Sequence, residues 1–191
     1  MDKTEQILQA AKEGAKKYFD EQVSLLTKFS SIDCGTGDEE GNKKIVAIVE
    51  NLLNTIQGIQ IEKHYSNIVA KLKPENPDGK IILSAHMDTV FKKGDTAENP
   101  PHIEGDRFYG LGSADCKGGL LVSIYGVNIL QENGLLPNKE IVFIFNCDEE
   151  SGTPVAHPVF DLEIPGTDMA FVFEPSRLDN GVVTSRKGTI R

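Results

Sequence analysis

One segment restricts the fold more than any other: the uninterrupted apolar run from Ile141 to Phe145, which the polar and acidic sequence NCDEE follows directly. A short apolar run with such a boundary is typical of a β-strand that is buried on both faces. Strands of this kind occur in sheets that helices cover on each side. The run is also far shorter than the about 20 residues of a membrane-spanning helix, so we expect no such helix.

The rest of the chain alternates between helical and β-like patterns. Apolar residues three or four apart predict helices over 4–29, 45–56 and 117–131, with Thr4 as N-cap of the first and Gly58 as C-cap of the second. β-prone runs occupy 59–64, 67–72, 81–84, 169–174 and 181–191, and 102–109 resembles a small hairpin. We expect 67–72 and 81–84 to be adjacent, and 169–174 to be buried like the central run. The alternation predicts an α/β domain with three layers, α/β/α, around a largely parallel mixed sheet.

Charge and cysteine content exclude several classes of partner and site. The 191 residues carry 29 acidic against 20 basic side chains, a net charge of −9. Such a chain repels phosphate backbones and anionic lipids, so we expect neither nucleic acid nor membrane as a partner. Its first residues mix acids and lysines where a secretory signal is apolar, which favours a cytoplasmic protein. Three cysteines without a CxxC spacing predict reduced thiols.

Polar residues gather where three of the predicted strands end. These residues are His86 and Asp88, then Asp148, Glu149 and Glu150, and finally Glu174. Because the carboxyl ends of parallel strands meet at one edge of a sheet, we expect the three groups to converge. Taken alone, each group is better explained as ordinary surface charge. His86 and Asp88 would be a surface loop pair, the acids 148–150 a solvated turn, and Glu174 a strand-end charge facing solvent. Together they would repel strongly unless cations neutralised them, which favours a metal cluster.

The segment GLGSADCKGG, residues 110–119, runs from a strand into a helix and invites comparison with phosphate-binding loops. A dinucleotide-binding loop would need glycine where Asp115 stands, and a Walker loop would need Ser or Thr directly after a Gly-Lys pair, whereas Lys117 precedes Gly118. Asp115 is then either a helix N-cap or, in the company of His86, a carboxylate that bridges metals. A thiol nucleophile is disfavoured, because no basic residue pattern that would stabilise a thiolate is visible.

The ordered motifs SAHMDTV, GLGSADCKGG, DEE and VFEP resemble those of the co-catalytic dizinc peptidase and deacylase family. Glutamate carboxypeptidase, acetylornithine deacetylase and succinyl-diaminopimelate desuccinylase are members, and the tail GVVTSRKGTIR is most similar to the first of these. The resemblance implies hydrolysis of an amide bond in an N-acyl amino acid or a short peptide. It also implies two zinc ions per complete active site, although carboxylate-rich ligands also suit cobalt or manganese.

The resemblance also implies roles for individual residues. His86 would bind one zinc ion together with Glu174, and Asp88 would orient the His86 ring. Asp115 would bridge both ions, and the peptide bond after it is expected to be cis. Glu150 would bind the second ion.

The remaining role, that of general base, falls by the same resemblance to Glu149. In such a centre, two cations acidify a bridging water and polarise the amide carbonyl, while an unligated glutamate takes the proton and passes it to the leaving amine.

Members of the family are considerably longer than 191 residues. We therefore interpret residues 1–191 as the N-terminal part of the catalytic domain, without the lid or dimerisation domain and without the last segment that carries a further metal-binding histidine. His157 is a weak substitute for that histidine, and Arg177 and Arg186 are available to bind a substrate carboxylate unless they are ordinary surface charges. An uncovered sheet edge would favour a homo-oligomer. The alternatives are an inactive metal-binding fragment and an acidic scaffold without metal.

Overall fold

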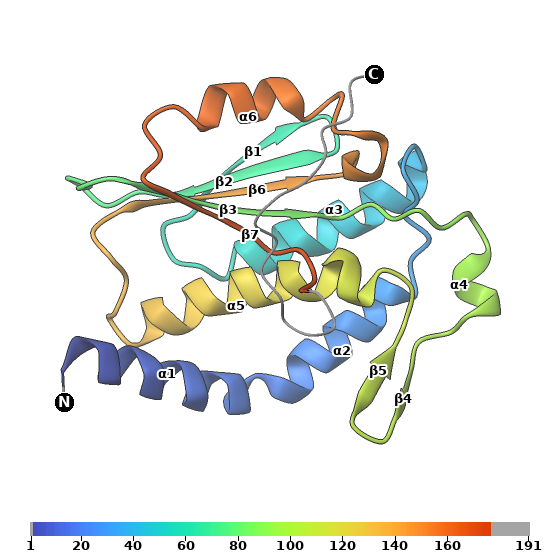
Figure 1. Ribbon diagram of the computed structural model, residues 1–191, viewed down its shortest axis with the longest axis horizontal. Helices are drawn as coiled ribbons and strands as arrows, with labels where there is room; N and C mark the ends of the chain where they lie inside the picture. Colours follow the sequence, from blue (N-terminus) through green and yellow to red (C-terminus); the bar gives the residue numbers. More distant parts are fainter. Residues whose placement is uncertain (1, 177–191) are drawn as a thin grey trace.

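The computed structural model describes residues 2–176 and contains a five-stranded mixed sheet with the order β1-β2-β6-β3-β7 (Figure 1). Its strands are β1 (Gln60–His64), β2 (Asn67–Leu72), β3 (Lys80–His86), β6 (Glu140–Asn146) and β7 (Met169–Val172). β3 pairs in parallel with β6 and β7, whereas β2 runs antiparallel to both of its neighbours. Within this five-stranded sheet, β2 alone therefore opposes the common direction, in agreement with the predicted sheet.

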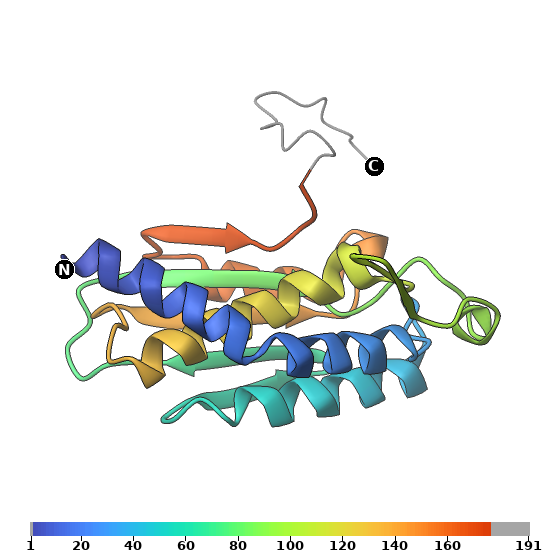
Figure 2. The same ribbon diagram turned by 90° about the horizontal axis from the view of Figure 1, so that it is seen from below.

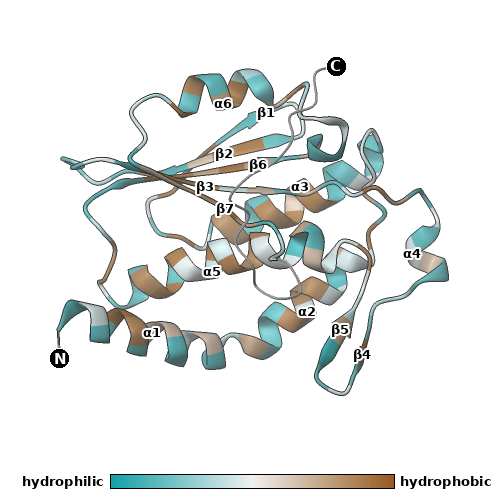
Figure 3. Cartoon of the chain, in the orientation of Figure 1, coloured by the Kyte–Doolittle hydropathy of each residue, from teal (hydrophilic) through white to brown (hydrophobic). Residues whose placement is uncertain are grey.

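Helices cover both faces of this sheet. α1 (Lys3–Lys17), α2 (Phe19–Ser30), α3 (Glu39–Leu53) and α5 (Gly118–Glu132) lie on one side, and the short α6 (His157–Glu163) lies on the other (Figures 1 and 2). Apolar residues of α3, of α5 and of the facing sheet form the larger core. Figure 3 colours the chain by hydropathy and shows brown, apolar segments on α3 and α5. A smaller core beneath α6 joins Val159 to apolar residues of β2, β3 and β6. The predicted three-layer α/β/α architecture is confirmed.

The central position in the sheet belongs to β6, which separates β2 from β3. The expectation that 67–72 and 81–84 are adjacent strands is therefore wrong. All but the first residue of β6 are buried. A strand that is apolar on both faces buries the most surface at the centre of a sheet, which outweighs the proximity of β2 and β3 along the chain. The crossover through α5 brings β6 back parallel to β3.

The first helical pattern is divided in two. Tyr18, with φ −102° and ψ 6°, interrupts the helix that was expected over 4–29. Its hydroxyl group donates a hydrogen bond to Glu132, and its ring lies 5.2 Å from that of Tyr125. Asp2 rather than Thr4 is the N-cap of α1. The break follows from these contacts with α5, which a one-dimensional apolar pattern does not contain.

The other differences are confined to the ends of elements and to the sheet edge. α3 ends at Leu53, before the expected Gly58, which has φ +83° in the turn that follows. β7 has β3 as its one partner among residues 2–176, and its side chains are exposed, with Phe171 at 48%. The expected burial of 169–174 on both faces is therefore wrong for β7, because no described helix covers it.

Three short elements project to one side of the sheet and helices (Figure 1). These are α4 (Asp95–Glu98), β4 (His102–Glu104) and β5 (Arg107–Tyr109), the last two forming the expected hairpin. Between residues 2 and 176, no helix is long and apolar enough to cross a bilayer. The β-prone stretch 181–191, Arg177 and Arg186 lie outside the described residues.

Candidate metal centre

His86 ends strand β3, where its side chain is 1% exposed. Its Nδ1 lies 2.9 Å from the main-chain oxygen of Asp88. Its Nε2 lies 2.8 Å from Oδ1 of Asp115 and 3.5 Å from Oε1 of Glu174. An imidazole whose Nδ1–H donates to a carbonyl presents its other nitrogen as a ligand, which is the usual arrangement of a metal-binding histidine.

Asp88 is fully buried beside this imidazole and joins two segments of the site. Its carboxylate accepts hydrogen bonds from the Thr36 hydroxyl group and from the main-chain N–H groups of Glu149 and Glu150, and it lies 3.3 Å from Nδ1 of His86. Burial alone would raise the pKa of Asp88, but the hydrogen bonds from His86 and Thr36 outweigh it and lower the pKa below its usual range. Asp88 is thus an ionised group that positions both the ring and the acidic turn.

Asp115 reaches the site from the turn Ser113–Lys117, which leads into α5. The peptide bond between Asp115 and Cys116 is cis, as the resemblance implies. Lys117, the last residue of the turn, holds it in place. Its side chain is buried, and its ammonium group donates hydrogen bonds to the main-chain oxygens of Phe29 and Leu111. A buried lysine is rare unless its charge is paired or hydrogen-bonded, so these two bonds fix where the turn lies.

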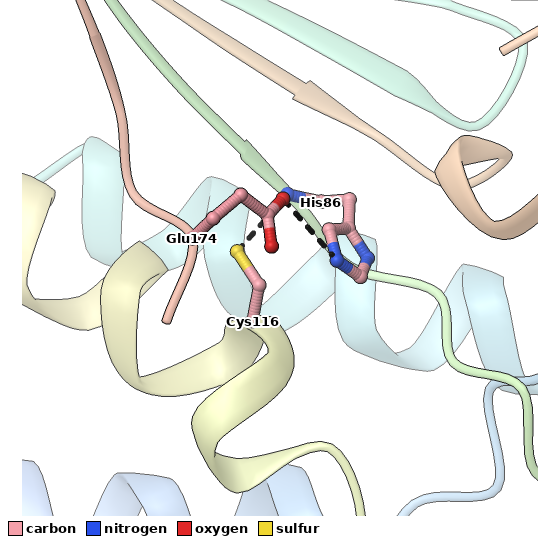
Figure 4. Close-up of side chains that lie close together, drawn as sticks. All are labelled: His86, Cys116 and Glu174. Atoms are coloured by element: carbon pink, nitrogen blue, oxygen red, sulfur yellow. Dashed lines mark hydrogen bonds and ion pairs between the residues drawn. The ribbon is translucent and has the colours of Figure 1, made fainter. Parts of the chain in front are cut away.

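Glu174 follows β7 and points toward His86, with Cys116 close by (Figure 4). The ligand atoms of His86, Cys116 and Glu174 all lie within 4.8 Å of one another. The sequence did not single out Cys116 as a ligand, and its position directly after Asp115 was the one available signal. Burial raises the pKa of the Cys116 thiol to about 12, and its Sγ contacts the main-chain oxygen of Phe173. In the metal-free chain the Cys116 thiol is therefore protonated at neutral pH.

Glu149 and Glu150 lie on a short 3-10 turn, Glu149–Ser151, just after β6. One ligand atom from each, together with one from His86, forms a second group within 4.8 Å. Asp148, which the sequence placed in the same cluster, is instead buried and accepts hydrogen bonds from the main-chain N–H groups of Val155 and Ala156. Asp148 closes the loop after the turn, whereas Glu149 and Glu150 lie beside His86.

The charges of this centre favour a bound cation. Burial raises the pKa of both Glu150 and Glu174, and the neighbouring carboxylate of Asp115 adds to the effect in each case. Burial would lower the pKa of His86, but hydrogen bonds to Asp88 and Asp115 and the charge of Glu174 raise it to about 9. The neighbouring carboxylates thus keep the His86 imidazole protonated at neutral pH. One imidazole with several carboxylate oxygens is a donor set that fits zinc, cobalt or manganese in place of that proton.

The other histidines do not join this centre. His157 is exposed on α6, where its Nδ1 lies 3.2 Å from the carboxylate of Asp161. His64 ends β1, and His102 stacks on the ring of Tyr109 in the hairpin. Neither of the two groups of ligand atoms found within residues 2–176 contains any of them. The idea that His157 substitutes for a missing ligand is therefore wrong for this structure.

The amino-acid sequence is similar to that of a known protein family. The sequence profile of peptidase family M20/M25/M40 matches residues 82–188, which is more than half of the chain. The chain belongs to this family. Carboxypeptidase G2 of Pseudomonas sp. (strain RS-16) is 36% identical over 162 residues, covering 81% of this M20-family chain and 38% of that protein. Acetylornithine deacetylase of Aliivibrio salmonicida is 32% identical over 146 residues, or 71% of the chain and 36% of the relative.

Solved structures share the M20 fold. Human carnosine dipeptidase 1 superimposes with a TM-score of 0.72 at 18% identity, over 91% of this chain and 42% of that one. An M20 family metallo-carboxypeptidase from Sulfolobus solfataricus gives a TM-score of 0.65 at 20% identity, over 82% and 38% of the two chains. The M20-family chain described here thus spans less than half the length of the relatives that it matches.

Proposed function

We propose that this protein contributes the catalytic centre of a metal-dependent amidohydrolase that cleaves an amide bond in an N-acyl amino acid or a short peptide. The observation that carries the proposal is the position of His86, whose Nε2 faces the carboxylates of Asp115 and Glu174. The names of its relatives, a carboxypeptidase and a deacetylase, agree with this reaction class and substrate class.

The proposed metal ligands divide between two ions. His86, Asp115 and Glu174 would hold the first, whereas Asp115 and Glu150 would hold the second. When bound, such ions supply Lewis acidity for a water molecule and for the carbonyl group of the substrate. Zinc is the metal that we propose, and cobalt or manganese would suit the same oxygen-rich set.

Protein groups would carry out the proton transfers. Glu149 is exposed beside these ligands, and we assign to its carboxylate the role of general base that takes a proton from water and delivers it to the leaving amine. Asp88 acts through other groups, since it orients the His86 ring and holds the main chain of Glu149 and Glu150. It is a positioning residue.

We further propose that residues 1–191 are the N-terminal part of a longer catalytic domain. With two protein ligands rather than the usual three, the second ion would bind much more weakly than the first. The alternative to an active hydrolase is a fragment that binds metal but does not hydrolyse amides. The edge of β7 that has no partner strand within residues 2–176 would favour pairing with a second copy, because unpaired strand edges recruit further strands.

Zinc titration of this chain, followed by calorimetry and elemental analysis, tests the metal centre. We expect one tight site in the wild type, its loss in His86→Ala, and lower occupancy in Asp115→Ala. Asp161→Ala, which removes an exposed acid on α6, serves as the control and should bind as the wild type does. Absence of zinc binding in the wild type would favour the acidic scaffold.

Hydrolysis of N-acetylornithine and of an acylated glutamate tests the activity. We expect negligible turnover by the chain alone. In a longer form that includes the last metal ligand, Glu149→Gln should keep its zinc but lose roughly 10²- to 10⁴-fold in rate, which is the usual contribution of a general base. Unchanged turnover in Glu149→Gln would overturn the assignment.

A further inference from the structure

Thr36 lies in the loop between α2 and α3, and its hydroxyl group donates a hydrogen bond to Oδ2 of Asp88 over 2.5 Å. A bond this short is typical of a hydroxyl group that donates to an ionised carboxylate. The bonds that Asp88 receives from the main chain are longer, at 3.2 Å from the nitrogen of Glu149 and 3.3 Å from that of Glu150. Thr36 therefore makes the shortest of these contacts with a group that lies at the centre of the site.

The two carboxylate oxygens of Asp88 have different partners. Oδ1 lies 3.3 Å from Nδ1 of His86 and accepts from the main chain of Glu149, whereas Oδ2 accepts from Thr36 and from the main chain of Glu150. The χ2 torsion of an aspartate has no sharp staggered minima, so hydrogen bonds decide how its carboxylate is turned. Without the hydroxyl group, Oδ2 would keep only the long bond from Glu150, and the carboxylate would be free to turn.

The position of Thr36 does not depend on its own hydroxyl group. Its main-chain N–H donates to the oxygen of Thr89, and the N–H of Thr89 donates to the oxygen of Cys34, each over 3.1 Å. Gly35 forms a parallel bridge with Thr89, and a Cβ atom at Gly35 would lie 2.3 Å from the main-chain oxygen of Phe91. These main-chain contacts hold the loop against the segment after β3, so a variant that loses only the hydroxyl group should keep the loop in place.

We propose that Thr36 is a positioning residue of the metal centre, which acts through Asp88 on the His86 ring and on the turn that carries Glu149 and Glu150. The inference rests on the metal centre that is part of the proposed function. By fixing the plane of the Asp88 carboxylate, the hydroxyl group holds the imidazole and the turn in their binding arrangement before a metal arrives. Groups that orient ligands in this way typically change metal affinity by about 10- to 100-fold.

Zinc titration by calorimetry tests the role of the hydroxyl group. Thr36→Val replaces it with a methyl group of similar size, and we expect about 10-fold weaker zinc binding, at the low end of that range because Thr36 acts through Asp88. Thr36→Ser restores the hydroxyl group and should bind zinc within about twofold of the wild type. Thr55→Val is the matched control, because Thr55 is exposed and its hydroxyl group donates to the main chain of Leu52.

Two results of this titration would overturn the proposal. One is wild-type zinc affinity in Thr36→Val. The other is an equal loss in Thr36→Val and Thr36→Ser, which would assign the effect to packing of the methyl group rather than to the hydroxyl group.

A further variant separates positioning from general stability. Val49 is fully buried on α3, and Val49→Ala should lower the Tm by leaving a cavity while keeping wild-type zinc affinity. The visible absorption of bound Co²⁺ reports the arrangement of its ligands, and we expect it to change in Thr36→Val but not in Val49→Ala. If Val49→Ala lost as much zinc affinity as Thr36→Val, affinity would simply follow stability and the proposal would fail.

Amide hydrogen exchange on the metal-free chain distinguishes this proposal from the proposed function. We expect the main-chain N–H groups of Glu149 and Glu150 to exchange several-fold faster in Thr36→Val than in the wild type or in Thr36→Ser, because the carboxylate that accepts from them is no longer held. Faster exchange in Thr36→Val, in a chain whose wild type binds no zinc, would refute the metal centre but support the link from Thr36 to the turn. Unchanged exchange at both groups would overturn the positioning role of Thr36.

Discussion

The carboxylate of Asp88 accepts a hydrogen bond from the main-chain N–H of Glu149, with Oδ1 and N 3.2 Å apart. This bond connects the segment after β3 with the acidic turn after β6. The same carboxylate lies against the ring of His86. One buried side chain therefore sets the relative positions of an imidazole and of two glutamates before any metal is bound.

Replacement of this group should destabilise the protein. Asp88→Ala leaves the Thr36 hydroxyl group and two main-chain N–H groups without their acceptor, and we expect a loss of roughly 2–4 kcal/mol in the free energy of unfolding. Urea denaturation measures the loss. Asp161→Ala removes an exposed acid whose partner is His157 and should change stability by less than about 0.5 kcal/mol. Similar losses in both variants would contradict the structural role of Asp88.

Two glycines of α5 should respond to alanine in opposite ways. A Cβ atom at Gly119 would lie 2.0 Å from the main-chain oxygen of Phe173, so Gly119→Ala must displace the segment that carries Glu174. We expect lower stability and weaker zinc binding in calorimetry. Gly126 has no heavy atom within 4 Å of the corresponding position, and Gly126→Ala should stabilise the helix by up to about 1 kcal/mol. Unchanged zinc affinity in Gly119→Ala would show that the segment is free to move.

The three thiols should react slowly with alkylating reagents. Cys34, Cys116 and Cys147 are free and buried, and burial raises the pKa of each thiol. Because the thiolate is the reactive form, iodoacetamide at pH 8 should label the native chain far more slowly than the same chain in urea. Mass spectrometry of the labelled protein gives the rates. Rapid labelling of any one of the three cysteines in the native chain would contradict the described packing.

The ion pair between Lys71 and Glu163 should give a pH-dependent contribution to stability. The two groups are 2.7 Å apart between β2 and α6, and the hydrogen bond to Glu163 raises the pKa of Lys71 above its usual 10.5. A raised lysine pKa stabilises the fold below the unfolded-state pKa, and this stabilisation is lost as the pH rises through the folded-state value.

Denaturation at several pH values compares the wild type with Lys71→Met. We expect the stability difference between them to be largest near pH 8 and to shrink above about pH 10.5. Lys63→Met on the neighbouring strand, where the lysine is half exposed, is the control and should show little change at any pH. A difference that stays constant from pH 8 to pH 11 would argue against the pair.

The sequence predicted the parts of this fold that depend on local pattern. The apolar run that became β6 was located to within one residue, and the strand-end positions of His86 and Glu174 followed from the same reasoning. The order of strands did not follow, because pairing across the sheet depends on total burial rather than on distance along the chain. Tyr18 illustrates the same limit, since its partners lie on α5.

Within the candidate site, residue type alone did not separate neighbours with different roles. Asp148 and Glu149 are adjacent acids, yet Asp148 closes a loop and Glu149 lies beside His86 and Glu150. The difference arises from the direction of each side chain after β6, which depends on tertiary contacts. The sequence also showed no sign that Oδ1 of Asn42 and Nδ2 of Asn67 are buried without a hydrogen-bond partner within residues 2–176, because hydrogen-bond satisfaction is a property of the folded chain.

The pairing of β3 with β6 also has a kinetic consequence. Lys80 lies opposite Glu140 and His86 opposite Asn146, so pairing of the two strands closes a long loop of intervening chain that includes α5. Contacts between residues so far apart in sequence form slowly, because the entropy of closing the loop is lost before the contacts are gained. His86 and the acidic turn are therefore not neighbours until the sheet is assembled. We therefore expect a metal ion to meet a finished binding site, and to lengthen the lifetime of the native state rather than to speed refolding.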